Sequence, residues 1–546
     1  MGFKWSYGRW GWISGKSLVI VAVFSVYAGI MCWRHDIFEE MDGVIQYFAG
    51  REIISLQGYR GWASYFWPPL YPLLLGLGAC VFSGFVAGKL ISLLAGIATL
   101  FVAYYLYREL CGDEDTALGA QLLLAVNPIF VCCSIQAENH MLDTFFYVSA
   151  LWIMLKISGE TDWRRLRNQA LLLGLFSGLA CLSRYTSYSL IPVIMLLCLF
   201  LVPYRRCLWY FLLAFVMVES PWWLYNTLVN GSPLFTMQYV NVGTGVFNDD
   251  MKWWWYDHVK FSGVLDIFFS YPGLYMRNYR ENVIESLILI RREMAVLAPV
   301  LEWGFAYALL RLEQRRVGIV MAAMTAYVVL VSQAFVFAEV FLSWVVVLQP
   351  FCVMAIREYW LLFGHRWLKW PARAVVVKWG ILFSLAFLAL ASFNRMHDRV
   401  QGYLARDGFD DGQTVRTHEV ARALRQYDPQ IETKYVMSIS PSRAYYAGSR
   451  WLLVPYYYEG NIDGLVCYRG LDPRVKRFAP KYPTQSDAGN LCADYLVCDL
   501  SFVGHLPQFR FMLNPKSPEI PSHFKPIFIS REVVVYHIMH GAMHCR

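Results

Sequence analysis

Charged residues are scarce in this chain. Only 16% of its 546 residues are Asp, Glu, Lys or Arg, whereas soluble proteins carry about 25%. Hydrophobic residues make up 57%, and they occur in blocks close to the roughly 20 residues that a helix needs to cross a bilayer. This composition excludes an ordinary soluble protein and predicts a polytopic α-helical membrane protein.

Paired metal-ligand cysteines are also missing from the sequence. None of the 13 cysteines stands in a CxxC pair or another zinc-type spacing, and most lie in apolar blocks as small hydrophobic residues. RNP, zinc-ribbon and basic-helix patterns are absent as well. The net charge of +8 is therefore assigned to cytoplasmic loops rich in Lys and Arg, and no nucleic-acid partner is expected.

Twelve apolar blocks predict about eleven or twelve transmembrane helices. The first block has basic flanks but no small-residue cleavage site after it, so it is predicted to be a membrane helix and not a signal peptide. The blocks are Ser17–Trp33, Trp67–Gly84, Gly88–Tyr107, Thr116–Gln136, His140–Ile157, Asn168–Ser183, Thr186–Pro203, Cys207–Leu228, Met294–Leu310, Val317–Ala338, Val340–Ile356 and Ala374–Phe393.

Basic loops predict the orientation, because Lys and Arg concentrate on the cytoplasmic side. They place the N-terminus and the loops around Arg164, Arg205, Arg315 and Arg366 inside. Outer loops 34–66 and 230–293 and the C-terminal tail then lie outside the plasma (inner) membrane. An odd number of blocks separates the first outer loop from Glu138, which must also lie outside, so one block does not cross.

Trp67–Gly84 is the candidate for the block that does not cross. It contains Pro68, Pro69 and Pro72 and is rich in glycine, which favours a broken or re-entrant helix lining a protein cavity. The alternative is that two short neighbours near Ser183 form one bent span.

The tail has a different composition from the membrane part. Short β-like runs alternate with a helical stretch at Thr417–Tyr427, a pattern that predicts a small α/β domain. The runs are Lys434–Ile439, Tyr495–Asp499, Lys525–Ile529 and Val533–His537. We therefore divide the chain into a membrane domain, 1–393, and a soluble extracytoplasmic domain, 394–546.

Acidic residues gather on the predicted outer face. Asp42 begins a run to Ile53 with apolar residues at helical spacing, which predicts an amphipathic helix on the membrane surface. Asp42 is then a candidate functional acid, or simply a helix cap. Glu138 and Asp143 flank the start of another block, where ionisable groups usually line cavities. The alternative is that they are interfacial loop residues without a functional role.

Two cations lie on the same predicted face. Lys89 is at the start of one block, and Arg184 stands between two others. A lipid phosphate would suit both side chains, although basic residues at block ends also serve as simple headgroup anchors.

Several motifs together resemble the GT-C superfamily of membrane glycosyltransferases, in the branch of protein O-mannosyltransferases and lipid A aminoarabinose transferases. The order and spacing of the motifs along nearly the whole chain carry the likeness. They are Asp42-Gly…Tyr47-Phe-Ala…Ile53, Trp67-Pro-Pro-Leu-Tyr-Pro72, Lys89–Gly96 with Tyr105–Gly112, Gly178–Tyr185, Pro221–Asn226 with Gly231-Ser-Pro233, and in the tail Tyr445–Arg450 and Ala493–Val497.

The resemblance implies a reaction and roles for single residues. A sugar on a polyprenyl phosphate or diphosphate would pass to an acceptor on the outer face, with Asp42 matching the family's presumed general base and Glu138 its second acid. Lys89 and Arg184 would bind the donor phosphate. The stretch of Trp67, Pro68, Pro69 and Tyr71 would form a cavity wall. One base and no covalent step give inversion.

Three departures from the family's pattern concern metal and phosphate binding. Phe66 and Trp67 replace an acidic residue and a lysine before the prolines, Ser343 and Trp344 stand where an Arg-Tyr motif is usual, and Tyr225 replaces an arginine. No cofactor is therefore certain. A divalent metal is left open: His258 could replace a ligand, although a lone loop histidine more often has no such role.

The sequence thus predicts an inverting, polyprenyl-phosphate-sugar-dependent glycosyltransferase of the cell envelope. Its partners would be the lipid-linked donor, membrane lipid, and a glycan, lipid or protein acceptor. The alternatives are a polytopic transporter or lipid flippase, and a non-catalytic protein that binds lipid-linked sugar. A transporter would show inverted repeats or paired broken helices in both halves, and the sequence has neither.

Overall fold

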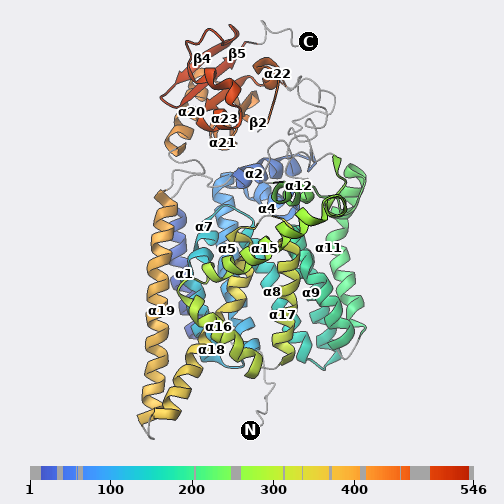
Figure 1. Ribbon diagram of the computed structural model, residues 1–546, viewed down its shortest axis with the longest axis vertical. Coiled ribbons are helices and arrows are strands. Elements are labelled where there is room, and N and C mark those ends of the chain that lie inside the picture. The colour runs from blue at the N-terminus through green and yellow to red at the C-terminus, as the bar shows by residue number, and fades with distance from the viewer. Residues whose placement is uncertain are drawn as a thin grey trace.

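The computed structural model contains a helical bundle and a separate sheet domain at one end of it (Figure 1). It describes residues 14–33, 41–56, 58–59, 66–201, 205–247, 260–311, 314–334, 336–367, 372–405, 413–455, 457–467 and 492–539. His258 and the acidic residues between 34 and 40 lie outside these ranges.

The bundle is built from helices of very different length. In the first half these are α1 (Gly15–Trp33), α2 (Met41–Ile54), α4 (Leu70–Gly78), α5 (Gly84–Cys111), α6 (Glu114–Ala125), α7 (Pro128–Ile135), α8 (His140–Gly159), α9 (Trp163–Ser183), η1 (Tyr185–Ser189), α10 (Leu190–Leu196) and η2 (Leu197–Leu201). The second half has α11 (Cys207–Asn230), α12 (Gln238–Val246), α14 (Val264–Ser270), α15 (Pro272–Glu293), η4 (Ala295–Leu297), α16 (Ala298–Arg311), α17 (Gln314–Val331), η5 (Ala338–Phe341), α18 (Leu342–Trp367) and α19 (Ala372–Ala405).

The predicted class is confirmed, but fewer helices can cross a membrane than the sequence indicates. Within the described ranges, 7 helices are long and apolar enough, or up to 8 if α6 and α7 count as one span. The reason is that several apolar blocks are interrupted. Asn127-Pro128 bends the Thr116–Gln136 block by 60°, because Asn127 caps a new helix at Phe130 and proline suits its first turn.

The blocks named as candidates for a broken or bent span are both short in the structure. Trp67–Gly84 contains only α4, whose 9 residues extend about 14 Å, half the thickness of the hydrocarbon core. The block after Ser183 divides into η1, α10 and η2, which form a short apolar helix from Tyr185 to Phe200. Neither segment is long enough to cross a bilayer as a straight helix.

Close packing holds α9 against α11. A Cβ atom at Gly174 would lie 2.3 Å from the carbonyl oxygen of Phe211, and one at Gly178 would lie 2.8 Å from Val218. These glycines are four residues apart and therefore share one helix face, the arrangement that lets membrane helices approach closely. Lipid is as apolar as the helix surfaces, so hydrophobic burial does not hold the two helices together in a membrane. Close van der Waals packing stabilises their contact instead.

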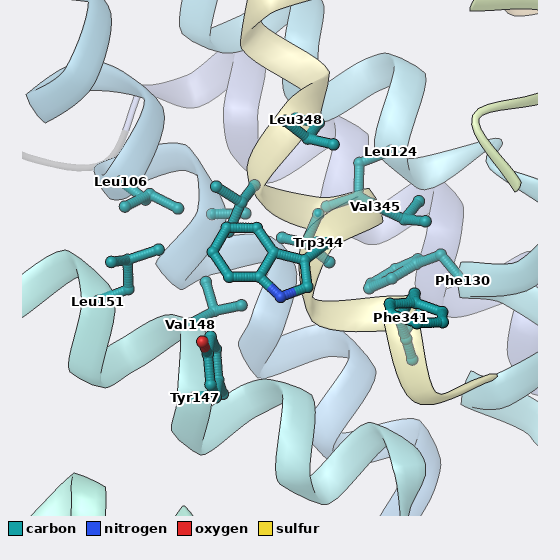
Figure 2. Close-up of a cluster of buried hydrophobic side chains, with 14 of the residues drawn as sticks. Leu106, Leu124, Phe130, Tyr147, Val148, Leu151, Phe341, Trp344, Val345 and Leu348 are labelled. Atoms are coloured by element: carbon teal, nitrogen blue, oxygen red, sulfur yellow. The ribbon is translucent and has the colours of Figure 1, made fainter. Parts of the chain in front are cut away.

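The centre of the bundle is a dense apolar core around Trp344, which is fully buried (Figure 2). Side chains from five elements surround its ring: Leu106 of α5, Leu124 of α6, Phe130 of α7, Tyr147, Val148 and Leu151 of α8, and Phe341 of η5. The position where the GT-C motif departs from its usual Arg-Tyr is thus a packing position in this chain.

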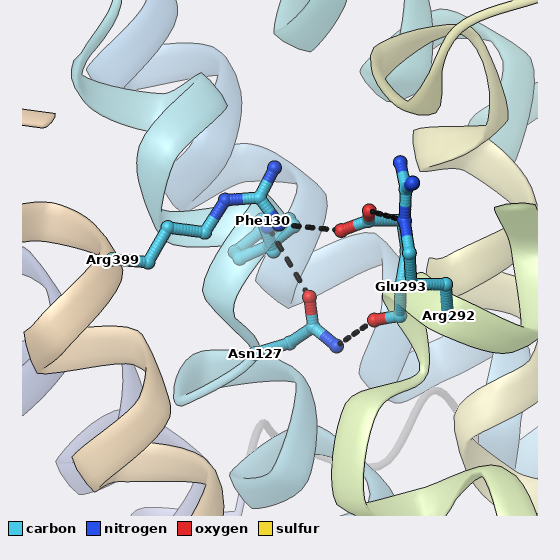
Figure 3. A network of polar contacts seen from close by, with 5 residues as sticks. All are labelled: Asn127, Phe130, Arg292, Glu293 and Arg399. Carbon is cyan, nitrogen blue, oxygen red and sulfur yellow. Dashed lines mark hydrogen bonds and ion pairs between the residues drawn. The ribbon is translucent and has the colours of Figure 1, made fainter. Parts of the chain in front are cut away.

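Helix α19 runs along one side of the bundle toward the sheet domain (Figure 1). Figure 3 shows the polar contacts that attach it. The buried carboxylate of Glu293, at the end of α15, accepts hydrogen bonds from Arg292 at 3.2 Å and from Arg399 of α19 at 2.5 Å. Asn127 donates to the Glu293 carbonyl at 3.1 Å. One residue therefore joins α7, α15 and α19.

The sheet domain has five strands in the order β2-β1-β3-β5-β4. The strands are β1 (Tyr435–Ser438), β2 (Arg450–Leu453), β3 (Tyr495–Asp499), β4 (Phe524–Ile529) and β5 (Val533–Ile538), and the helices are α20 (Gln413–Tyr427), η6 (Ile431–Thr433), α21 (Ser442–Ala447), α22 (Ile462–Val466), α23 (Leu500–His505) and η8 (Pro507–Leu513).

The predicted α/β character of the tail is confirmed by this sheet. β1 pairs in parallel with β2 and β3, while β5 pairs antiparallel with β3 and β4. Every residue of β3 is buried, as expected for a central strand covered on both faces. α19 continues past the predicted boundary at 393/394 to Ala405, and α20 is the first described element of the sheet domain.

Candidate active site

Helix α2 carries Asp42 in its first turn, at the end of the bundle nearest the sheet domain (Figure 1). The helix lies directly on α4, because Gly50 and Gly76 let the two backbones meet. A Cβ atom at Gly50 would lie 2.2 Å from the carbonyl oxygen of Pro72, and one at Gly76 would lie 2.3 Å from that of Gly50. The predicted helix is present, but protein covers its apolar side chains: Val44 joins a buried cluster with Phe85 and Ala137.

Arg184, His140 and Glu138 form a hydrogen-bonded chain. An Arg184 guanidinium nitrogen contacts His140 Nδ1, and His140 Nε2 lies 2.9 Å from a Glu138 carboxylate oxygen. Glu138 and His140 are 7% and 8% exposed, so both are shielded from solvent. The guanidinium also lies 5.4 Å from the centre of the Phe337 ring, which fixes it from a second side.

The chemistry of arginine determines the state of His140. A guanidinium donates hydrogen bonds and cannot accept them, so Nδ1 accepts from Arg184 and carries no proton. The proton of the neutral ring is then on Nε2, from which it is donated to Glu138. His140 therefore orients the Glu138 carboxylate, a role that the sequence analysis did not assign to it.

Asp42 is the second acid beside Arg184. Burial raises the pKa of its carboxyl to about 6, and the positive charge of Arg184 partly offsets that rise. The Arg184 charge thus acts on Asp42, and the same guanidinium is linked to Glu138 through His140. Three of the four predicted site residues are brought together from α2, the α7–α8 connection and the end of α9.

Asp143 is a further acid close to this group. It lies in the first turn of α8, is 3% exposed, and accepts a hydrogen bond of 2.6 Å from the Ser187 hydroxyl of η1. Ser187 and Arg184 are both at the junction of α9 and η1. This short turn therefore supplies partners to the acids of the neighbouring helix.

Lys89, the fourth predicted residue, lines a cavity of about 590 Å³ whose lining does not include Asp42, Glu138 or Arg184. Its ammonium donates to the Cys32 carbonyl at 3.3 Å and lies 4.6 Å from the centre of the Phe85 ring. Helix α5 lines the cavity and also contacts the acidic group. One turn further along α5, Ser92 donates to the Glu138 carbonyl at 3.0 Å.

The predicted wall residues Trp67, Pro68, Pro69 and Tyr71 lie around α4 and do not line this cavity. Tyr71 is closest to it: its hydroxyl would lie 3.2 Å from a Cβ atom at Gly88, the residue before Lys89. The Trp67 carbonyl accepts from Tyr59 at 3.0 Å. Tyr225, which stands where the family often has arginine, donates to the Tyr59 carbonyl at 2.6 Å.

Metal binding finds no support in this group of side chains. Among the described residues, no cluster of three or more His, Cys, Asp or Glu side chains could hold an ion. Glu138 and His140 are occupied with each other and with Arg184, and a guanidinium beside them disfavours a cation.

Known proteins are similar to this chain in one sequence segment and in the overall fold. Residues 67–225 match the family model of dolichyl-phosphate-mannose-protein mannosyltransferases, whereas no curated protein matches the chain. ArnT from Cupriavidus metallidurans in the apo state is 14% identical, with a TM-score of 0.63 over 96% of this chain and 97% of that one. Its form bound to undecaprenyl phosphate gives a TM-score of 0.58 at 14% identity, over 96% and 98%.

A second structure is similar over a large part of its length. The archaeal oligosaccharyltransferase AglB from Archaeoglobus fulgidus, in complex with an inhibitory peptide and a dolichol-phosphate, is 14% identical, with a TM-score of 0.55 over 88% of this chain and 69% of that one. The chain therefore shares its fold with ArnT and AglB, and residues 67–225 have the likeness to mannosyltransferases that the motifs indicated.

Proposed function

We propose that this protein transfers a sugar from a polyprenyl-phosphate-linked donor to an acceptor hydroxyl. The observation that carries the proposal is the meeting of Asp42, Glu138 and Arg184 beside the cavity that contains Lys89. Three distant segments supply two acids and a cation, next to a cavity that Lys89 lines. ArnT and AglB, which share the fold, bind undecaprenyl phosphate and dolichol-phosphate.

The chemistry follows from the charges of these groups. Asp42, as the carboxylate, accepts the proton of the acceptor hydroxyl while the oxygen attacks the anomeric carbon. The bond from that carbon to the phosphate oxygen breaks, and its electron pair leaves with the phosphate. Positive charge on the sugar ring at the transition state favours nearby carboxylates, and Glu138 is held in place by His140.

The departing phosphate needs positive charge. Lys89 is the cation in the cavity and would bind the phosphate directly, while Arg184 faces the acids and would stabilise the site as charge moves. One displacement without a covalent intermediate inverts the anomeric centre. The acceptor would be a glycan, lipid or protein of the cell envelope.

The test is transfer by the purified, full-length protein. Labelled undecaprenyl-phosphate-linked sugars, offered one at a time with cell-envelope extract, should yield a labelled product that depends on the protein. Mass spectrometry of surface glycans from cells with and without the gene would identify the acceptor. Failure of every lipid-linked donor, with glycans unchanged, would contradict the proposal.

We also propose that the sheet domain lies on the outer side of the plasma membrane. The positive-inside distribution of Lys and Arg supports this orientation, and so does the Cys467–Cys492 disulfide of the domain, since such bonds persist in oxidising compartments. A reporter enzyme that is active only outside the cytoplasm, fused to the C-terminus, should be active. An expressed but inactive fusion would contradict the orientation.

The pKa of Asp42 predicts the pH dependence of transfer. A carboxyl with a pKa of about 6 loses its role as a base when it gains a proton, so kcat/KM should fall as the pH decreases through 6. Between pH 7 and pH 5 the ionised fraction decreases about tenfold. Arg184→Met should move the midpoint upward, since the Arg184 charge lowers this pKa. A flat profile over this range would mean that Asp42 is not the base.

A further inference from the structure

The sheet domain takes part in forming the cavity of Lys89. Tyr445 and Tyr446, from α21 of that domain, line the cavity together with Lys89 and Phe85 of α5 and Tyr47 of α2. These tyrosines belong to the Tyr445–Arg450 motif of the tail, for which the resemblance implies no role. The cavity is therefore completed by a part of the chain more than 350 residues away from Lys89.

Tyr445 contacts two of the helices that carry candidate site residues, α2 and α5. Its hydroxyl accepts a hydrogen bond of 3.1 Å from the backbone N–H of Phe85, in the first turn of α5, where N–H groups have no partner within the helix. Its ring meets that of Tyr47 edge to face, with centroids 4.9 Å apart. Tyr445 also packs against the cluster of Val44, Phe85 and Ala137.

These contacts lead directly to Lys89. Phe85 is four residues before Lys89 and lies on the same helix face, and its ring is the cation–π partner of the ammonium at 4.6 Å. Holding the backbone of Phe85 thus fixes the ring that fixes the lysine. Asp42 is on the other helix in contact, two residues before Val44 in α2.

The sheet domain presents this pair of tyrosines firmly. Arg443, in the same short helix α21, is fully buried and paired with Asp499 at the end of β3. Tyr446 packs edge to face on Tyr445, with centroids 4.8 Å apart, and on His418 of α20 at 4.7 Å. The aromatic surface toward the cavity therefore has the core of the domain behind it.

We propose that Tyr445 and Tyr446 are positioning residues for the lipid-phosphate carrier, and that docking of the sheet domain sets how tightly the carrier phosphate is held at Lys89. The identity of the carrier and the binding of its phosphate at Lys89 rest on the proposed function. The alternative is that undocking the sheet domain leaves the affinity for the carrier phosphate unchanged.

The experiment measures binding of undecaprenyl phosphate to full-length protein in detergent by native mass spectrometry. Tyr445→Phe keeps the ring but removes the acceptor for the Phe85 N–H, and should weaken binding about fivefold, the loss expected for one hydrogen bond. Tyr445→Ala removes the ring contacts as well and should weaken it more than tenfold. In transfer assays both should raise KM for the donor and change kcat less.

A matched control comes from the same domain. Tyr427 of α20 also hydrogen-bonds through its hydroxyl, to His537 at 3.2 Å, but its partner is within the sheet domain. Tyr427→Phe should therefore leave the affinity for undecaprenyl phosphate unchanged. Thermal unfolding of each variant shows whether the domain itself stays folded.

The outcomes separate the two proposals. Normal affinity and normal donor KM in folded Tyr445→Ala would overturn the positioning role, even if the wild type transfers sugar. Weakened binding in the Tyr445 variants, with no transfer by the wild type from any donor, would instead support the cavity assignment and overturn the proposed function. Equal weakening in Tyr427→Phe would mean that the effect is general destabilisation, and would also overturn the role.

Discussion

Asp42→Asn is expected to reduce the rate of sugar transfer by a factor of about one hundred to ten thousand, the loss typical of a missing general base. The amide has the shape of the carboxylate but cannot take a proton from a hydroxyl. Asp42 lies in the first turn of α2, where Asn is also well tolerated, so the helix should stay in place. Initial rates with a labelled lipid-linked donor check the expectation.

Asp162→Asn provides the matched control for Asp42. Asp162 caps α9, accepting a hydrogen bond of 2.9 Å from the Arg164 N–H, and has no role in the proposed site. If Asp42 were only a helix-terminal acid, both variants would behave alike and transfer at nearly the wild-type rate. Activity of Asp42→Asn within about threefold of the wild type, far less than a base contributes, would leave Glu138 as the preferred acid.

Asp499→Asn is expected to destabilise the sheet domain by about 3–5 kcal/mol, the usual cost of leaving a buried charge without its partner. Asp499 has two tasks: it caps α23 by accepting from the Phe502 N–H at 2.7 Å, and it pairs with Arg443. Asn can keep the cap but not the charge, so the variant isolates the ion pair. Denaturant unfolding monitored through hydrogen exchange of the β3 amides measures the change in the free energy of unfolding.

An exposed pair and a double variant provide the comparisons for Asp499. Lys434 lies 3.8 Å from Asp494 with 36% of its side chain exposed, so Lys434→Met should cost less than about 1 kcal/mol. Combining Arg443→Met with Asp499→Asn removes both charges, keeps the cap of α23, and should recover much of the lost stability. If Asp499→Asn unfolds within about 1 kcal/mol of the wild type, in the range of an exposed pair, the buried pair is not what holds α21.

The sequence is informative wherever local pattern decides the structure. Unbroken apolar runs became helices close to their predicted bounds, as with Ser17–Trp33 and α1 (Gly15–Trp33). Alternating patterns in the tail located four of the five described strands. β2 (Arg450–Leu453) was missed, since its four residues lie inside a motif noted only for its resemblance to the family.

Hydrophobicity alone overestimated the number of membrane-spanning helices, because it does not show where an apolar block is interrupted. Asn127-Pro128 is a turn signal within an apolar block, and it could have revealed the break between α6 and α7. No such signal marked His140. Its role comes from Arg184, 44 residues away, and only the folded chain brings the two together. The separation of Lys89 from the acids likewise depends on how α5 packs.

The short stretch of chain between Ala405, the end of α19, and Gln413, the start of α20, has an energetic consequence for docking. Because few residues of one chain join the two domains, docking is intramolecular and needs less contact energy than the same contact between separate molecules. The contact around Tyr445 can therefore be weaker than one between separate molecules and still keep the sheet domain docked on the bundle. The hydrogen bond of Tyr445 adds to an apolar contact, in which Ile45 and Ala49 of α2 share one buried cluster with the core of the sheet domain.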